Sequence, residues 1–144
     1  LQLTRRHERV LMEDDVVADE DRIRKTLFGD RPGAEVIIAS HNEKPAGFAL
    51  FFHNYSTFLG RSGVYLEDLF VIPELRGRGI GKILLQTLAR IAVDRDCGRL
   101  EWSVLDWNEP AIRFYKRLGA IPMDGWTVFR VDGTTLKDLA DLSS

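Results

Sequence analysis

The sequence contains few of the residues that build disulfide or metal frameworks. One cysteine and three histidines occur among its 144 residues, so no intramolecular disulfide forms, and the histidines lack metal-ligand spacing with Cys97. Cys97 precedes a glycine without a nearby histidine, and we interpret it as a packing residue rather than a nucleophile. No apolar run approaches the roughly 18 residues of a membrane span, and no secretory pattern is visible. These absences predict a reduced cytoplasmic protein with no metal and no membrane partner.

A large excess of charge of one sign is also absent. The chain has 22 acidic and 20 basic residues, for a net charge of -2, which is too little to hold nucleic acid. With 44% hydrophobic residues at this length, we expect one compact domain over residues 1–144. The sequence begins at Leu1 without methionine. We interpret its first dozen residues as the end of a helical segment from which earlier residues are missing.

Hydrophobic periodicity predicts an α/β order of elements. The predicted strands, the first two forming a hairpin across the polar residues 41–45, span residues 35–40, 47–53, 64–72, 99–105 and 126–131. The predicted helices are residues 19–28 ending at Gly29, residues 79–94, and a helix that Pro110 opens and Gly119 ends. This order is typical of a mixed sheet flanked by helices.

The segment RGRGIGK, residues 76–82, lies between the predicted strand 64–72 and the longest predicted helix. Its three glycines permit close approach of a ligand to backbone amides at a helix N-terminus, and its three cations attract an anion. A dinucleotide fingerprint would need glycine at Lys82, and a P-loop would need Ser or Thr at Ile83. If the glycines served only to make a tight turn, the cations would be unexplained. The segment therefore predicts a pyrophosphate site.

The pattern Arg76-x-x-Gly79-x-Gly81 resembles the signature of the GNAT superfamily of N-acetyltransferases. The resemblance implies the GNAT fold, a mixed sheet whose central strands splay apart and whose central strand carries a bulge. It further implies that acetyl-CoA is the co-substrate, with the pantetheine arm on the central strand and the pyrophosphate on the glycine-rich segment. The residues assigned to the cofactor in this way are Leu69, Phe70, Val71, Arg76, Gly77, Arg78, Gly79, Ile80, Gly81 and Lys82.

Two consecutive acids, Glu67 and Asp68, interrupt the apolar strand before this segment. Neighbouring strand residues face opposite sides, so only one of them would reach a given cleft unless a bulge intervenes. A carboxylate there could attract an ammonium group and accept its proton, directly or through water. The alternative is that the acids bind loop amides and stabilise the sheet, which is equally compatible with the sequence for Asp68.

The segment WNEPAIRFYKRLGA, residues 107–120, resembles the GNAT region that carries a tyrosine beside the thioester sulfur. Position alone favours a core role for Tyr115, because it lies on the apolar stripe of its helix. The resemblance instead implies that Tyr115 protonates the departing CoA thiolate. It also implies that Asn108 contacts the pantetheine arm, although Asn before Glu-Pro is equally typical of a helix start.

The segment YLEDLFV, residues 65–71, together with the two motifs above, resembles the diamine acetyltransferase group, which covers spermidine/spermine and thialysine enzymes. YSTFLGR at 55–61 and VLDWN at 104–108 are closer to the thialysine branch, and Ser56 stands where the polyamine branch carries an acid. The resemblance implies a homodimer, and an acceptor site whose acids correspond to Glu8, Glu67 and Asp124, with Asp68 beside them. The group's first strand and most of its first helix have no counterpart before Leu1.

These observations predict direct transfer of an acetyl group to the primary amine of a small cationic acceptor. Two alternatives stay open at this point. One is acetylation of a protein lysine or N-terminus, which requires an open groove instead of an acidic pocket. The other is a non-catalytic acyl-CoA sensor, against which the presence of both Glu67 and Tyr115 argues.

Overall fold

A computed structural model describes the backbone of residues 2–4 and all of residues 33–142. The predicted helix 19–28 and Glu8 lie outside the described residues. In chain order the elements are β1 (Gln2–Thr4), β2 (Glu35–His41), β3 (Lys44–Ser56), β4 (Arg61–Val71), η1 (Pro73–Leu75), α2 (Ile80–Asp94), β5 (Leu100–Trp102), α3 (Glu109–Arg117) and α4 (Gly133–Ala140). The chain divides into two compact units, Leu1–Ser103 and Val104–Ser144.

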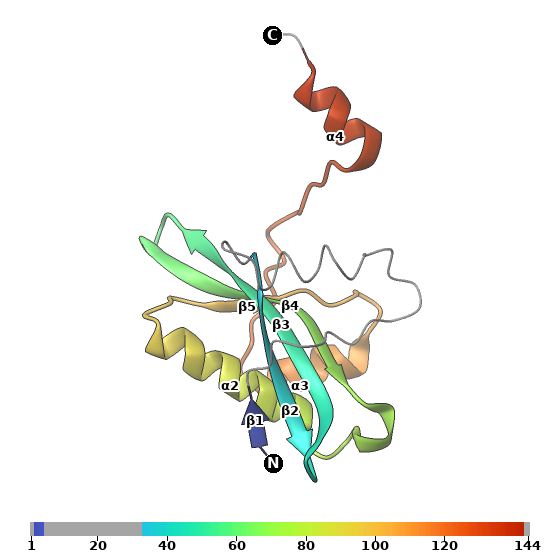
Figure 1. Cartoon of the computed structure of the whole chain (residues 1–144). Helices are drawn as coiled ribbons and strands as arrows, with labels where there is room; N and C mark the ends of the chain where they lie inside the picture. Colours follow the sequence, from blue (N-terminus) through green and yellow to red (C-terminus); the bar gives the residue numbers. More distant parts are fainter. Residues whose placement is uncertain (1, 5–32, 143–144) are drawn as a thin grey trace. The chain divides into compact units, whose positions relative to one another are not determined.

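The first unit contains a five-stranded sheet in the order β1-β2-β3-β4-β5 (Figure 1). The pairs from β1 to β4 are antiparallel and the β4–β5 pair is parallel, so the sheet is mixed as predicted. The predicted hairpin is confirmed: His41 pairs with Lys44, and both turn residues have positive φ, 51° at Asn42 and 65° at Glu43. Such a two-residue turn matches the right-handed twist of the strands.

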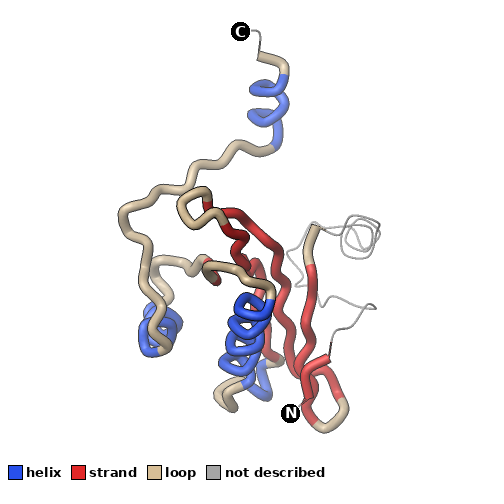
Figure 2. Tube along the Cα trace, turned by 90° about the vertical axis from the view of Figure 1, so that its left-hand side faces the viewer, coloured by secondary structure: helices blue, strands red, loops and turns tan. Residues whose placement is uncertain are grey.

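Helix α2 lies against one face of the sheet and builds the core of this unit (Figure 2). Its apolar stripe contributes Leu84 and Leu88, which are fully buried together with Phe51 of β3 and Val64 of β4. The apolar spacing that predicted a helix over 79–94 is therefore the packing face, and the prediction is confirmed. Alternation along β3 directs Phe48 to the opposite face, where it belongs to a second buried cluster with Val36 and Ile38.

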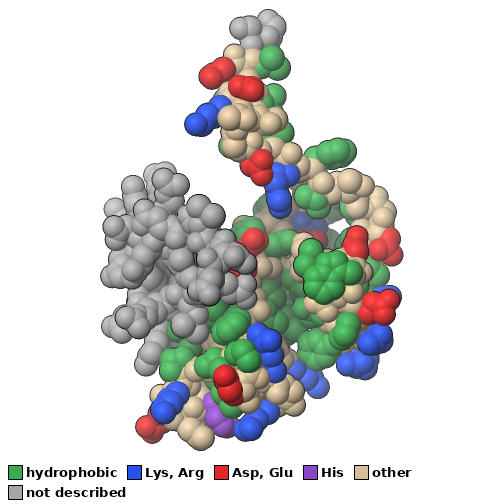
Figure 3. Space-filling view, turned by 90° about the vertical axis from the view of Figure 1, so that its right-hand side faces the viewer, with side chains coloured by type: hydrophobic (Ala, Val, Ile, Leu, Met, Phe, Trp, Pro, Cys, Tyr) green, Lys and Arg blue, Asp and Glu red, His purple; other side chains and the backbone are tan. Residues whose placement is uncertain are grey.

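Two expectations about strands are wrong. Residues 126–131 form no strand, although their pattern predicted one, and the helix α4 that follows was not predicted. Residues 2–4 form β1, paired with β2, where a helical segment was expected. Within the second unit no described residue is buried, and Leu136 and Leu139 of α4 are more than half exposed. Hydrophobic side chains are visible on the surface of the described residues in Figure 3. A strand needs a neighbouring strand for its hydrogen bonds, whereas a helix closes its own.

No helix in the described part of the chain combines the length and the apolar composition that crossing a bilayer requires.

The prediction for α3 is confirmed at both ends of the helix. Pro110 lies in the first turn, and Gly119 follows the helix with a φ of 95°, a left-handed conformation that suits glycine.

Candidate active site

The glycine-rich segment forms the turn from β4 and η1 into α2, as the sequence predicted. Gly77 and Gly79 have φ values of 80° and 83°, a region that disfavours residues with a Cβ. A Cβ added at either position would meet nothing within 4 Å, so the backbone conformation and not crowding requires glycine. Gly79 is the N-cap of α2 and no side chain caps this end. The first amides of the helix therefore remain available to an anion.

The cations of this segment differ in how firmly they are held. Arg76 donates from Nε to the carbonyl oxygen of Val71 at 3.0 Å, and its guanidinium lies 5.7 Å from the centre of the Phe70 ring. Arg78 and Lys82 are exposed, and neither forms an ion pair with another described residue. Arg76 thus fixes the turn to the end of β4, while the other two cations face solvent.

The central strand splays from its neighbour. The β4–β5 ladder consists of Val64 with Leu100, Tyr65 with Glu101, and Leu66 with Trp102, and it stops there although β4 continues to Val71. On the other side of β4, Phe51 faces Leu66 but Leu50 faces Asp68, so Glu67 is an extra residue. This is a β-bulge at the point where the ladder ends. Both the bulge and the splay that the family resemblance implied are therefore present.

Beyond the splay, one edge of β4 has no neighbouring strand among the described residues. Ile72 donates its backbone N–H to Ala46 of the adjacent chain segment at 2.8 Å, so alternation directs the N–H and C=O of Val71 and Leu69 away from β3. The backbone groups of Phe70 point toward β3. Of the three strand residues predicted to pair with a cofactor arm, Leu69 and Val71 have the required orientation, and the Val71 carbonyl oxygen already accepts a hydrogen bond from Nε of Arg76.

Glu67 and Asp68 are exposed at the bulge. Neither acid makes an ion pair or a hydrogen bond with another described residue, so the alternative in which Asp68 binds loop amides has no support within that part of the chain. The extra residue of the bulge interrupts the regular alternation of side chains along β4. Glu67 and Asp68 are therefore not restricted to opposite faces of the strand. The site thus has two carboxylates next to an open strand edge.

The second unit carries the residues predicted from the segment 107–120. Asn108 is the N-cap of α3, and its Oδ1 accepts a hydrogen bond from the Ala111 amide at 3.3 Å, which confirms the helix-start interpretation. Tyr115 is half-buried in α3, its ring centroid lies 5.7 Å from that of Phe114, and burial raises the pKa of its hydroxyl. A phenol of raised pKa keeps its proton at neutral pH. Asp124 is exposed in the loop that follows.

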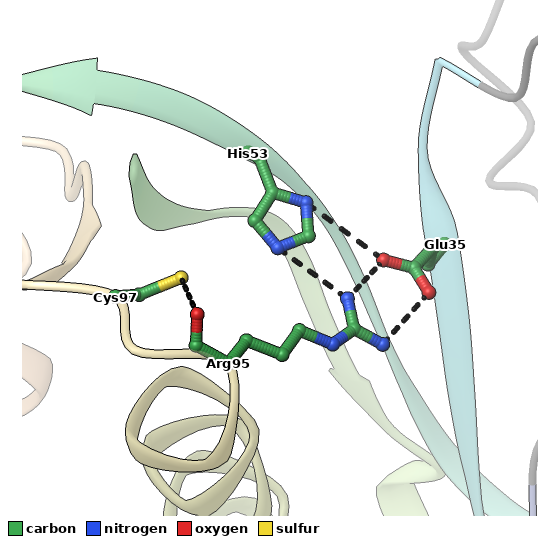
Figure 4. Close-up of polar contacts among 4 residues, drawn as sticks. All are labelled: Glu35, His53, Arg95 and Cys97. Atoms are coloured by element: carbon green, nitrogen blue, oxygen red, sulfur yellow. Dashed lines mark hydrogen bonds and ion pairs between the residues drawn. The ribbon is translucent and has the colours of Figure 1, made fainter. Parts of the chain in front are cut away.

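A polar cluster at the far end of α2 was not predicted (Figure 4). The guanidinium of Arg95 binds both carboxylate oxygens of Glu35, at 2.6 and 3.0 Å, and its Nη1 lies 3.4 Å from Nε2 of His53. Burial, and secondly the charge of Arg95, lower the pKa of His53. Cys97 is buried nearby, with Sγ 3.9 Å from the Arg95 carbonyl oxygen, as expected of a packing residue. No group of three His, Cys, Asp or Glu side chains within the described ranges could hold a metal.

Comparison with known proteins agrees with this geometry. The family model described as Acetyltransferase (GNAT) family matches residues 4–120. The chain belongs to the GNAT acetyltransferase family. It is therefore an acyltransferase of a family that uses acetyl-CoA as co-substrate, and the uncapped α2 N-terminus and the open β4 edge suit that molecule.

Relatives narrow the group within the family. Thialysine N-epsilon-acetyltransferase of Bos taurus is 36% identical over 140 residues, which cover 90% of this chain and 82% of that protein. L-ornithine N5-acetyltransferase of Arabidopsis thaliana is 44% identical over 98 residues, 68% of this chain and 43% of that protein. An integron cassette protein from the mobile metagenome of V. cholerae is similar in structure, with a TM-score of 0.76, 32% identity, and coverage of 89% and 82%. The chain thus falls in the diamine acetyltransferase group that its motifs indicated.

Proposed function

We propose that this enzyme transfers the acetyl group of acetyl-CoA to the primary amine of a small cationic acceptor of the thialysine, lysine or diamine type. The observation that carries the proposal is the bulge at Glu67, which sets an exposed carboxylate where β4 parts from β5. Similarity to thialysine and ornithine acetyltransferases over most of the chain supports an amine on an aliphatic arm. An ammonium group is attracted by carboxylates and must lose a proton before it attacks a thioester.

The cofactor is held by backbone groups more than by side chains. In this proposal the pyrophosphate lies at the N-terminus of α2, over Gly77, Gly79 and Gly81, with Arg78 and Lys82 beside it. The pantetheine arm pairs with the open edge of β4 through Leu69 and Val71, as an added strand would. Because Oδ1 of Asn108 already caps α3, a contact from this residue to the arm would come from Nδ2.

The reaction is a direct transfer in this proposal. Glu67 accepts a proton from the bound ammonium group, through a water molecule, and the free amine attacks the thioester carbon. A strand amide stabilises the oxyanion of the tetrahedral intermediate. The carbon–sulfur bond then breaks, and Tyr115 donates its proton to the CoA thiolate. Burial raises the pKa of Tyr115, so its hydroxyl keeps its proton at neutral pH and is available as the donor.

In this proposal, acidic residues around the acceptor site make the enzyme prefer cationic acceptors. Glu67 and Asp68 lie on β4, and the family resemblance adds Glu8 and Asp124. Assembly as a homodimer belongs to the same proposal. The two rival functions are acetylation of a protein lysine or N-terminus and acyl-CoA sensing without turnover, and both are decided by the acceptor that is turned over.

The decisive experiment measures thiol release from acetyl-CoA with thialysine, lysine, ornithine, putrescine, spermidine, spermine and basic peptides. We expect turnover of a small amine, with kcat lowered about a hundredfold or more in Tyr115→Phe. Tyr55→Phe is the matched control, because Tyr55 is an exposed tyrosine of β3. Turnover of peptides alone would favour the protein acetyltransferase, and CoA binding without any turnover would favour the sensor. Wild-type turnover by Tyr115→Phe at every pH would remove the tyrosine from the mechanism.

A further inference from the structure

A short hydrogen bond joins β4 to the end of β5 at the point where the strands part. The hydroxyl of Tyr65 and Oγ of Ser103 lie 2.6 Å apart. Tyr65 is opposite Glu101 in the parallel ladder, whose last pair is Leu66 with Trp102, so Ser103 is the first residue beyond it. The bond therefore runs diagonally across the fork between the two strands.

Tyr65 and Glu101, which face each other in the ladder, are both contacted by side chains of β3, the strand on the other side of β4. The Tyr65 ring lies 5.2 Å from the ring of Phe52, the residue that faces it on β3. Glu101 accepts a hydrogen bond from Nδ2 of Asn54 at 3.2 Å and forms an ion pair with Nε of Arg99 at 2.7 Å. These contacts connect β3 to β5 across β4, so the position of β5 at the fork is determined by side chains as well as by the ladder.

A glycine makes this second connection possible. Gly63 lies between the Asn54 and Arg99 side chains, and a Cβ at this position would come within 2.4 Å of Asn54 Oδ1 and 3.1 Å of Arg99 Cγ. The side chains of β3 and β5 therefore meet over β4 only because Gly63 has no side chain. The Tyr65–Ser103 bond continues the same connection on the same face, one step closer to the fork.

Nothing in a parallel ladder by itself fixes where pairing stops, because the next backbone groups of both strands are able to pair or to separate. The bond is exposed, so its contribution to the free energy of folding is small. Its location distinguishes it: it joins β5 to β4 just before Glu67, where the ladder ends and the β4 edge at Leu69 and Val71 begins.

We propose that Tyr65 and Ser103 are positioning residues that set the opening between β4 and β5 for the pantetheine arm of the co-substrate. This inference rests on the proposed function, since it assumes that the arm pairs with the β4 edge. The two hydroxyls act through the backbone of that edge and need not touch the cofactor. Without either hydroxyl, the spacing between β4 and β5 is no longer fixed. The backbone groups of β4 that pair with the pantetheine arm are then displaced.

The test measures CoA affinity by calorimetry for wild type, Tyr65→Phe, Ser103→Ala and the double variant, with thermal unfolding of each. Tyr65→Phe retains the ring contact with Phe52. We expect each single change to raise the Kd for CoA about two- to tenfold, the range that one hydrogen bond accounts for. The double variant should be no weaker than the weaker single variant, because both remove the same bond.

Two further variants sharpen the comparison. Ser103→Thr keeps a hydroxyl and should restore near-wild-type CoA affinity. Tyr55→Phe, at an exposed tyrosine whose hydroxyl bonds no other described residue, should leave it unchanged. In steady-state assays, KM for acetyl-CoA should rise in Tyr65→Phe while kcat and KM for the amine stay close to wild type.

Several outcomes would overturn the proposal. Unchanged CoA affinity in Tyr65→Phe, with or without a lower unfolding temperature, would leave the bond with a purely structural role. A raised KM for the amine at unchanged CoA affinity would mean that the hydroxyls contact the acceptor instead. A wild-type protein that binds no CoA would remove this inference and the proposed function together, whereas additive effects in the double variant would remove this inference alone.

Discussion

Residues 33–103 and residues 104–142 come from one chain but form structure in different ways. Every buried residue of the described chain lies between Val36 and Cys97, and all of them except Cys97 are in the sheet or α2. Residues 104–142 bury none, and they contain two helices and no strand. The first region contains a buried core, and within the second region only the two helices have regular structure.

The difference explains the strand that was wrongly predicted. Trp126, Val128 and Phe129 have the β-propensity of a strand, yet they are 73%, 86% and 92% exposed and extend without a ladder. The following helix α4 needs no neighbour for its backbone hydrogen bonds. Propensity predicts a strand only where the fold supplies another strand beside it.

The largest expected effect contrasts two leucines on helices. Leu88→Ala in α2 removes a fully buried side chain and should lower the free energy of unfolding by about 2–5 kcal/mol. Leu139→Ala in α4 is the matched control, because this leucine is 54% exposed, and should change it by about 0.5 kcal/mol or less. Urea denaturation measures both. Equal losses would show that residues 104–142 contribute to a core after all.

A smaller effect contrasts two glycines. Gly79→Ala forces a Cβ into a left-handed conformation at φ 83° and should cost about 1–2 kcal/mol, because that region is unfavourable for L-residues. Gly125, in the second unit, has no positive φ, and a Cβ there would meet no neighbour within 4 Å. The Gly125→Ala variant should therefore be as stable as the wild type. Thermal unfolding and CoA affinity are the measurements. If Gly79→Ala unfolds like wild type but loses CoA, the glycine serves the ligand and not the turn.

A similar contrast exists between the two helix starts of the second unit. Asn108→Ala removes the cap of α3 and should cost about 1 kcal/mol of helix stability. Asp132→Ala should cost less, since Asp132 makes no side-chain hydrogen bond at the start of α4. Helical circular dichroism during denaturation compares them. A global loss of unfolding free energy in Asn108→Ala, equal to that of a core change, would contradict local stabilisation of this unit.

The smallest expected effect concerns pH. Because the pKa of His53 is lowered in the folded state, the unfolded chain binds the proton first, and stability falls as pH drops below the usual value of 6.5. His53→Gln should flatten this loss between about pH 7.5 and 5.5 relative to wild type. The His41→Gln variant controls for other histidines. A wild-type stability that rises on acidification through this window would refute the lowered pKa.

Much of the candidate site could be predicted because its signals are local. The glycines and cations of residues 76–82, the stripe of α2 and the cap at Asn108 each depend on residues within a few positions of one another. The pattern could not reveal that Gly79 is required by backbone conformation alone. Nor did it single out Tyr65, Ser103 or Glu101, which are ordinary residues until the parallel ladder brings β4 and β5 together.

The sequence by itself determined the family, the glycine-rich turn and the helices α2 and α3, since helix starts, stripes and glycine turns are encoded by neighbours in the chain. Only the tertiary structure decided that Glu67 is a bulge, that β5 ends at Trp102, and that residues 126–131 form no strand. Strand pairing depends on residues far apart in the chain, and a register that stops or shifts leaves no mark in the local pattern.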